Sequence, residues 1–198
     1  MATAALMTRL GDPARIGLLA DTHCHEPGAS DLPDSVVQAF QGVDLVVHLG
    51  DMGHAAVLTR LAAVADVVAT RGRDDPPEDH RIAPSTRVIE AGGLVVGAVF
   101  DLAAVDLASV DGDRLDFRDG FSSELLCEAF GRRVDVVAFG ATHRDVVALY
   151  RGVLLVNPGS PTLPARPRAG TSGTAAVLDL RGGVATVEIV AVGESPRQ

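Results

Sequence analysis

The feature that most constrains the fold is a regular alternation of short apolar runs with amphipathic segments. Residues 16–20, 43–49 and 66–69 are short runs rich in Val, Leu and Ile, as expected for buried strands. Between them, residues 33–40 and 55–64 repeat their apolar side chains at helical spacing. This β-α-β-α-β succession predicts a parallel sheet that is covered on both faces.

The rest of the chain predicts further strands, most of them paired as hairpins, and one more helix. The expected hairpins pair 87–90 with 94–100, 146–150 with 153–156, and 175–180 with 184–190; the helix covers 122–130 and a further strand 134–139. The Pro/Gly/Ser-rich stretch at 157–173 is followed by only about two strands, which is too little for a second domain. We therefore expect one domain over residues 1–198, with residues 1–14 as an N-terminal tail.

Composition limits the surroundings and partners of the protein. A chain of 198 residues with 47% hydrophobic and 22% charged residues is typical of a soluble globular domain. The net charge of -9 argues against non-specific binding of nucleic acid or anionic lipid. No apolar run approaches membrane-spanning length, and the two cysteines form no zinc or redox pattern, so a cytoplasmic location is expected.

Polar residues collect where the predicted strands end. Ligands of open α/β sheets gather at the carboxyl ends of the strands. The residues at those positions are Asp21, His23, Asp51, Arg73, Asp74, Asp75, Asp101, His143, Asn157 and Ser160. Carboxylates and imidazoles of this kind suit Mn, Fe or Zn rather than a thiolate site.

Taken one by one, these residues have ordinary alternatives. Asp21 and His23 are two apart on an extended segment, so both side chains can converge on one ion, but Asp-x-His also occurs by chance. Asp51 follows a glycine that permits a sharp turn, and it could bridge two ions or simply cap the next helix. Their order along the chain favours the metal interpretation.

The segments LADTH, HLGD, ATRGRDD, AVFD, FGATH and VNPGS resemble an ordered series of motifs. That series, DxH, GD, GNxD, HG, GHTH and NPGS, is the one found in small prokaryotic calcineurin-like metallophosphoesterases. The match runs from about residue 16 to about residue 190, nearly the whole chain. The resemblance implies a four-layer α/β/β/α sandwich, an α/β fold, with the site at the strand ends.

The resemblance also implies one complete metal site and one incomplete site. The first metal of the family takes four ligands that are all present here: Asp21, His23, Asp51 and His143. The private ligands of the second metal are replaced by Arg73, Phe100 and Ala141. We therefore expect a single divalent ion, either Mn, Fe or Zn. A one-residue shift of the strand would turn Asp101 inward and restore part of the second site, an alternative that stays open and that applies equally to Asp74 and Asp75.

Two functions fit this pattern. In the first, Arg73 stands in for the missing cation and binds phosphate bidentately, in a single-metal phosphoesterase acting on a phosphodiester or a small phosphomonoester. In the second, the protein is an inactive interaction or scaffold module that binds a partner protein or forms a homo-oligomer, because a retromer subunit shares the fold. The enzyme is favoured, since random decay would not spare one whole ligand set. A structural metal would also preserve that set, and this alternative stays open.

The remaining polar residues receive supporting roles. His25 lies two residues after His23 and either donates a proton to the leaving group or is a surface histidine. Asn157 and Ser160 belong to the NPGS segment, which either shapes the site, with both residues expected to contact the substrate, or is an ordinary turn. His48 on its buried strand is expected to support Asp51.

Overall fold

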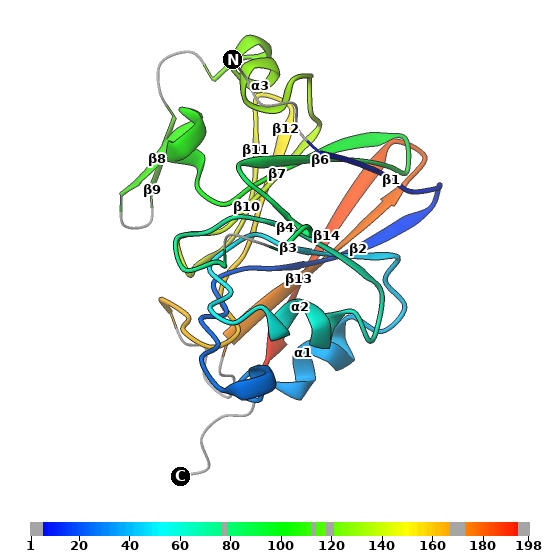
Figure 1. Cartoon of the computed structure of the whole chain (residues 1–198). Helices are drawn as coiled ribbons and strands as arrows, with labels where there is room; N and C mark the ends of the chain where they lie inside the picture. Colours follow the sequence, from blue (N-terminus) through cyan, green and yellow to red (C-terminus); the bar gives the residue numbers. More distant parts are fainter. Residues whose placement is uncertain (1–5, 77–78, 112–113, 118–120, 167–172, 194–198) are drawn as a thin grey trace.

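Two sheets packed face to face form the centre of the molecule, and helices lie on the outer faces (Figure 1). The structure is a computed structural model that describes residues 6–76, 79–111, 114–117, 121–166 and 173–193. In this part of the chain, no helix has the length and apolar character needed to cross a bilayer.

The first sheet contains the predicted β-α-β-α-β unit. Its strand order is β14-β13-β2-β3-β4-β5. The strands are β2 (Ala14–Leu19), β3 (Leu45–His48), β4 (Asp66–Thr70), β5 (Ile82–Ala83), β13 (Gly173–Arg181) and β14 (Val184–Val192). β2 to β5 are parallel, and the antiparallel β13–β14 hairpin extends the sheet at β2. Helices α1 (Asp34–Ala39) and α2 (Ala56–Leu61), with the short helix η1 (Pro27–Ala29), cover its outer face (Figure 1).

The second sheet is built mainly from hairpins. Its strand order is β1-β6-β7-β10-β12-β11. The strands are β1 (Leu6–Arg9), β6 (Thr86–Ala91), β7 (Leu94–Val99), β10 (Val136–Phe139), β11 (Asp145–Tyr150) and β12 (Val153–Pro158). On the outside lie α3 (Ser123–Phe130), η2 (Leu102–Val105) and a small hairpin of β8 (Ala108–Asp111) and β9 (Arg114–Phe117).

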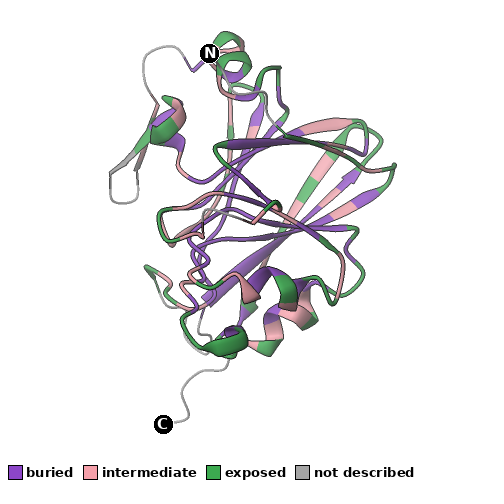
Figure 2. Cartoon of the chain, viewed as in Figure 1, coloured by how far each residue is buried: buried purple, intermediate pink, exposed green. Residues whose placement is uncertain are grey.

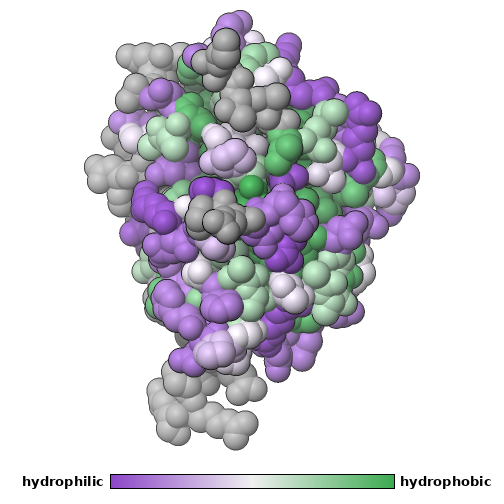
Figure 3. Space-filling view, viewed as in Figure 1, coloured by the Kyte–Doolittle hydropathy of each residue, from purple (hydrophilic) through white to green (hydrophobic). Residues whose placement is uncertain are grey.

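Three apolar clusters separate four layers. One lies between the two sheets and includes Ile16, Leu18, Val47 and Val96; one lies beneath α1 and α2, and one beneath α3. Burial follows the strands of both sheets, while the outer sides of the helices are exposed (Figure 2). On the face seen in Figure 3, polar and apolar residues are interspersed. The predicted α/β four-layer sandwich is therefore confirmed.

The sequence prediction was wrong at the N-terminus. Residues 6–9, which were assigned to a tail, form β1 and pair in parallel with β6, and Ala14 already belongs to β2. The three predicted hairpins and the helix beginning near 122 are present. Parallel pairing of β1 depends on a partner about 80 residues away, with Leu6 opposite Arg87. A local pattern does not reveal such a partner.

Candidate metal centre

Loops at one end of the two sheets carry the predicted metal ligands. Asp21 and His23 follow β2, Asp51 follows β3, and His143 follows β10. Ligand atoms of Asp21, His23 and His143 lie within 4.8 Å of one another, and those of His23, Asp51 and Asp74 form a second such group. Because the groups share His23, the structure brings all four predicted ligands into one cluster and adds Asp74.

The two histidines turn their Nε2 atoms toward each other. Nδ1 of His23 lies 3.0 Å from Oδ2 of Asp74, and Nδ1 of His143 lies 2.7 Å from the carbonyl oxygen of Leu163. A carboxylate and a carbonyl only accept hydrogen bonds, so these partners assign the protons to Nδ1 and the lone pairs to Nε2. The Nε2 atoms are 3.2 Å apart. Two nitrogens bound at about 2.0–2.1 Å to one tetrahedral ion would be separated by about 3.3 Å.

Asp21 gives the strongest indication of a cation. Its side chain is fully buried, and neither carboxylate oxygen has a hydrogen-bond partner among the described residues. Burial, and then the neighbouring carboxylate of Asp51, raise the pKa of Asp21 to about 8. The N–H groups of Ala141 and His143 oppose this rise, but they do not reach hydrogen-bond geometry. A buried carboxylate without hydrogen bonds is costly, and a bound cation would compensate for that cost.

Asp51 has one occupied and one available oxygen. Its Oδ1 accepts hydrogen bonds from the backbone N–H groups of Arg73 and Asp74, the latter at 3.1 Å. Its Oδ2 lies 3.9 Å from Nε2 of His23. The alternative that Asp51 caps the next helix is wrong, because α2 starts after Ala55 without a side-chain cap. The carboxylate is thus fixed by the loop after β4 and can offer Oδ2 to an ion.

The backbone at all four ligands has an unusual conformation. Asp21, His23, Asp51 and His143 have φ values of 52°, 41°, 55° and 57°. In residues with a side chain, this left-handed conformation costs roughly 1–2 kcal/mol each. The loops hold each other in it, since the N–H of Asp21 donates to Gly50 and that of His23 donates to the carbonyl of Asp51. Strain that is concentrated on one set of polar residues is typical of a functional site.

His48 supports the two metal-ligand loops from beneath, close to its predicted role. It is fully buried; its Nδ1 accepts from the N–H of Gly50 at 3.2 Å, and its Nε2 lies 3.1 Å from the hydroxyl oxygen of Thr22. That hydroxyl donates to the carbonyl of Met52 at 3.1 Å, so it accepts from His48. Burial lowers the pKa of His48 to about 3, which keeps the ring neutral.

Asn157 and Ser160 also hold loops in place. The amide of Asn157 donates to the carbonyl of Gly140 at 2.9 Å and to the hydroxyl of Thr142 at 3.1 Å. The hydroxyl of Ser160 donates to the carbonyl of Asp21 at 2.7 Å. Both side chains are fully buried, so they position the loops of His143 and Asp21. This geometry gives no support to their expected contact with substrate.

The other half of the expected site contains different side chains. The ring of Phe100 is buried and lies where a Cβ on Gly50 would be, so this position requires glycine. The guanidinium of Arg73 lies 5.4 Å above that ring, and its Nη2 lies 3.1 Å from Oδ2 of Asp101. The other oxygen of Asp101 caps η2 through the N–H of Ala103. Asp101 therefore pairs with Arg73 and belongs to neither ligand group found among the described residues.

Two further residues near the site need mention. The side chain of His25 is exposed, and its backbone N–H donates to Asp31 at 2.8 Å. Asp75 holds the loop after β4, because its carboxylate accepts from the N–H groups of Met52 at 2.7 Å and Gly72 at 2.6 Å. The sequence places Asp74 among the strand-end residues but gives it no role, since the motif leaves its position unspecified.

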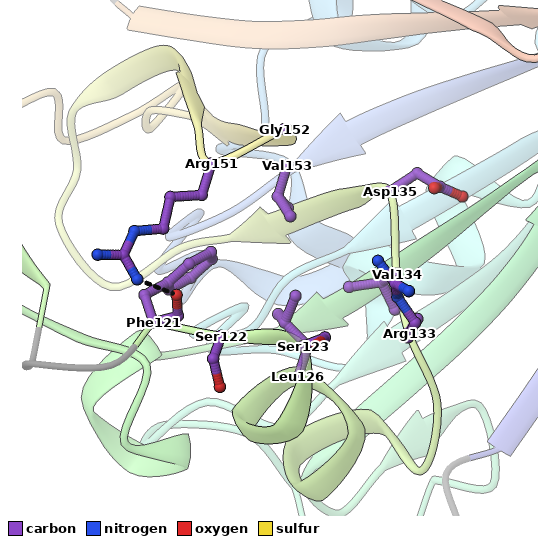
Figure 4. A pocket seen from close by; sticks show the side chains of 10 residues that line it. All are labelled: Phe121, Ser122, Ser123, Leu126, Arg133, Val134, Asp135, Arg151, Gly152 and Val153. Atoms are coloured by element: carbon purple, nitrogen blue, oxygen red, sulfur yellow. Dashed lines mark hydrogen bonds between the residues drawn. The ribbon is translucent and has the colours of Figure 1, made fainter.

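A separate hollow lies at the opposite end of the second sheet. Its volume is about 470 Å³, and it lies between the start of α3, the start of β10 and the β11–β12 turn (Figure 4). Arg151 points into this region and donates to the carbonyl of Phe121 at 3.0 Å. None of the predicted site residues lines this hollow.

Comparison with known proteins agrees with this geometry. Residues 15–183 match the calcineurin-like phosphoesterase superfamily domain. The chain belongs to this superfamily. A probable metallophosphoesterase of Methanocaldococcus jannaschii is 35% identical over 158 residues, which cover 80% of this chain and 73% of that protein. A phosphodiesterase of the same organism is 28% identical over 151 residues, 73% of this chain and 82% of that protein.

The fold also occurs among solved structures. Vps29 of Chaetomium thermophilum superposes with a TM-score of 0.59 at 21% identity, covering 92% of this chain and 100% of that chain. At this identity the likeness concerns the fold alone. The superfamily and its relatives support a phosphoesterase-like function that depends on divalent metal, and the His/Asp groups of this chain are suited to bind such an ion.

Proposed function

We propose that this protein is a phosphoesterase with one divalent metal ion, Mn, Fe or Zn, held by Asp21, His23, Asp51 and His143. The observation that carries the proposal is the buried carboxylate of Asp21, which has no hydrogen-bond partner among the described residues and lies beside the facing Nε2 atoms. Two imidazoles and two carboxylates form a donor set for these ions. When bound, such an ion would polarise a phosphoryl oxygen and lower the pKa of water.

Arg73 is proposed to bind the phosphate of the substrate. Its side chain is 68% exposed, so the guanidinium can exchange the carboxylate of Asp101 for another anion. A phosphate offers two oxygens to the planar guanidinium in place of the carboxylate. Two contacts keep the guanidinium close to the metal ligands. It lies over the ring of Phe100, and the backbone N–H of Arg73 itself donates to the carboxylate of Asp51. The proposed substrate is a phosphodiester or a small phosphomonoester.

His25 is proposed as proton donor to the leaving group. Its side chain is exposed, and the residue lies two positions after the ligand His23 in the chain. A general acid matters most for a poor leaving group. The variant His25→Ala should therefore slow hydrolysis of an alkyl phosphodiester far more than that of a nitrophenyl diester. An equal effect on both esters would remove His25 from this role, and His80→Ala, with a 94% exposed side chain, is the matched control.

A non-catalytic interaction module is the second candidate. Edge strand β11 exposes Val147 (49%) and Leu149 (74%), apolar side chains that a partner or a second copy of the chain could cover. This candidate predicts a stable homo-oligomer or complex. Light scattering that shows a monomer for the wild type, unchanged by Leu149→Ser, would count against it.

The decisive experiment combines metal analysis with turnover. Purified protein should contain one Mn, Fe or Zn per chain, and reconstituted protein should hydrolyse aryl phosphates or phosphodiesters. Asp21→Asn should lose both properties. Bound metal without turnover on a broad panel of phosphate esters would overturn the enzymatic part of the proposal and favour the interaction module.

A further inference from the structure

We propose that Asp74 is a positioning residue that fixes the ring and the tautomer of His23 for metal binding. This inference rests on the metal site of the proposed function. It assigns a role to a residue that the motif series leaves unspecified, so it concerns a property of this chain.

The contact between the two side chains is direct. Oδ2 of Asp74 lies 3.0 Å from Nδ1 of His23, and the His23 side chain is only 14% exposed. A free histidine carries its proton mainly on Nε2, which would leave no lone pair for an ion on that atom. The carboxylate reverses this preference, because it can only accept and therefore holds the proton on Nδ1. Nε2 is then free to face His143 at 3.2 Å.

Asp74 is itself held in place by the site. Its backbone N–H donates to Oδ1 of Asp51 at 3.1 Å, beside the N–H of Arg73. The next residue, Asp75, anchors the same turn to Met52 and Gly72. The loop after β4 thus contacts two ligands of the proposed metal, Asp51 through its backbone and His23 through the side chain of Asp74.

The geometry separates this role from direct metal binding. Nδ1 and Nε2 point away from opposite sides of the imidazole ring, so a carboxylate on Nδ1 lies outside the shell of an ion on Nε2. Carboxylate–histidine pairs of this kind orient the ligand and raise its basicity, and their loss typically weakens metal affinity about 10- to 100-fold. The Asp74 side chain is 51% exposed. Substitution should therefore leave the metal-free fold intact.

The test measures metal affinity without turnover. Apo wild type, Asp74→Ala, Asp74→Asn and Asp66→Asn are titrated with Zn²⁺ against a chromophoric chelator, and their metal-free unfolding midpoints are compared. Asp66, an exposed carboxylate at the start of β4, is the matched control. We expect Asp74→Ala to bind Zn²⁺ about 10- to 100-fold more weakly, with an unchanged apo midpoint, and Asp66→Asn to match the wild type. Wild-type affinity in Asp74→Ala would overturn the inference.

A spectroscopic measurement distinguishes positioning from a loss of structure. The ¹⁵N shifts of the imidazole of His23, assigned with His23→Gln, should report a proton on Nδ1 in the apo wild type and a shift toward Nε2 in Asp74→Ala. An unchanged tautomer would contradict the role, even if affinity fell. Failure of the proposed function looks different: Zn²⁺ would still bind more weakly to Asp74→Ala, but the wild type would hydrolyse no phosphate ester.

Discussion

The two halves of the candidate site differ in whether their polar side chains are satisfied in the absence of a metal ion. In one half, Asp21, His23 and His143 gather on strained loops, and the Asp21 carboxylate, which has no hydrogen-bond partner in the described part of the chain, lies beside two facing nitrogens. In the other half, Phe100 fills space against Gly50 and Arg73 lies above it, already paired with Asp101. The first half therefore holds a buried carboxylate that a cation would compensate, whereas the charges of the second half are already paired with each other.

This difference bears on the proposal that Arg73 takes the place of the second metal ion. Simple loss of ligands would leave a hole or unpaired polar groups. Here an aromatic ring and an ion pair occupy the region, and the guanidinium supplies one positive charge. This arrangement supports our proposal that the guanidinium takes the place of a metal ion in this half, and the following changes test it.

The largest effect is expected from Asp21→Asn in the first half. Loss of this carboxylate should abolish metal binding and reduce turnover by about 10³-fold or more. In the metal-free protein the same substitution should instead favour stability at high pH, because burial raises the pKa of Asp21 to about 8 from an ordinary value of 3.8. The apo wild type therefore loses stability as pH rises through this window, since the buried group must ionise, whereas the variant does not. Urea unfolding in chelator at pH 6 and pH 9 measures this.

The control for this change is Asp66→Asn, which should leave metal binding, turnover and the pH dependence of apo stability unchanged. If Asp21→Asn were less stable than the apo wild type at pH 9, the carboxylate would have another partner, and the argument for a cation at this place would fail.

The second change attempts to restore the lost half. The triple variant Arg73→Asn, Phe100→His, Ala141→His returns the donor types that the superfamily's motif series carries at these positions. Since Oδ2 of Asp51 is available for bridging, a second ion per chain should appear in elemental analysis. Arg73→Asn alone should not bind a second ion. If the triple variant also binds a single ion, the surroundings of the second half have changed beyond its ligands.

The fold was largely readable from the sequence, for a physical reason. Buried parallel strands are continuous apolar runs, and hairpins are indicated by turn sequences such as Gly92–Gly93. Local sequence patterns are therefore enough to predict the buried strands and the hairpins. β1 was not predicted because β6, the strand it pairs with in the described part of the chain, is distant in sequence, and its own residues, Leu6 to Arg9, show no clear alternation.

The site was readable in its residues but not in its contacts. The resemblance to the motif series indicated which four residues converge, and the meeting of parallel strand ends at one edge of a sheet agrees with it. It could not show that Asn157 and Ser160 are buried beneath the loops, or that Asp74 turns toward His23. Asp74 reaches His23 across 51 positions of the chain, Ser160 reaches Asp21 across 139, and Asn157 reaches Gly140 across 17. Each of these contacts depends on side-chain orientation between separate loops.

A smaller effect is expected from His48, which supports the first half from below. His48→Gln should cost about 1–3 kcal/mol of unfolding free energy at pH 7, because the N–H of Gly50 and the hydroxyl of Thr22 lose a well-placed partner. Burial lowers the pKa of His48 to about 3, so between pH 6.5 and 3 only the unfolded wild type takes up this proton. The wild-type advantage should therefore shrink by roughly 2–3 kcal/mol on going from pH 7 to 4.5.

Urea titrations of the apo proteins at the two pH values measure this difference, and His80→Gln, at an exposed histidine, should show none. A constant difference between the wild type and His48→Gln at both pH values would mean that the ring is not kept neutral by burial.

The smallest and most specific effect concerns the cation of the second half. Arg73→Ala should weaken binding of inorganic phosphate about tenfold, a modest change because the guanidinium is exposed and screened by solvent. Asp101→Asn should act in the opposite direction and strengthen phosphate binding a few-fold, because it removes the carboxylate that competes for the same donors. The phosphate affinity of Arg73→Lys should fall between those of Arg73→Ala and the wild type, since lysine keeps the charge but loses the fork geometry. Isothermal titration of the metal-loaded proteins compares the three variants with the wild type.

Equal phosphate affinities in Arg73→Ala and the wild type would show that the guanidinium only covers Phe100. The side chains of the second half would then fill the space of the second metal ion without taking over its role.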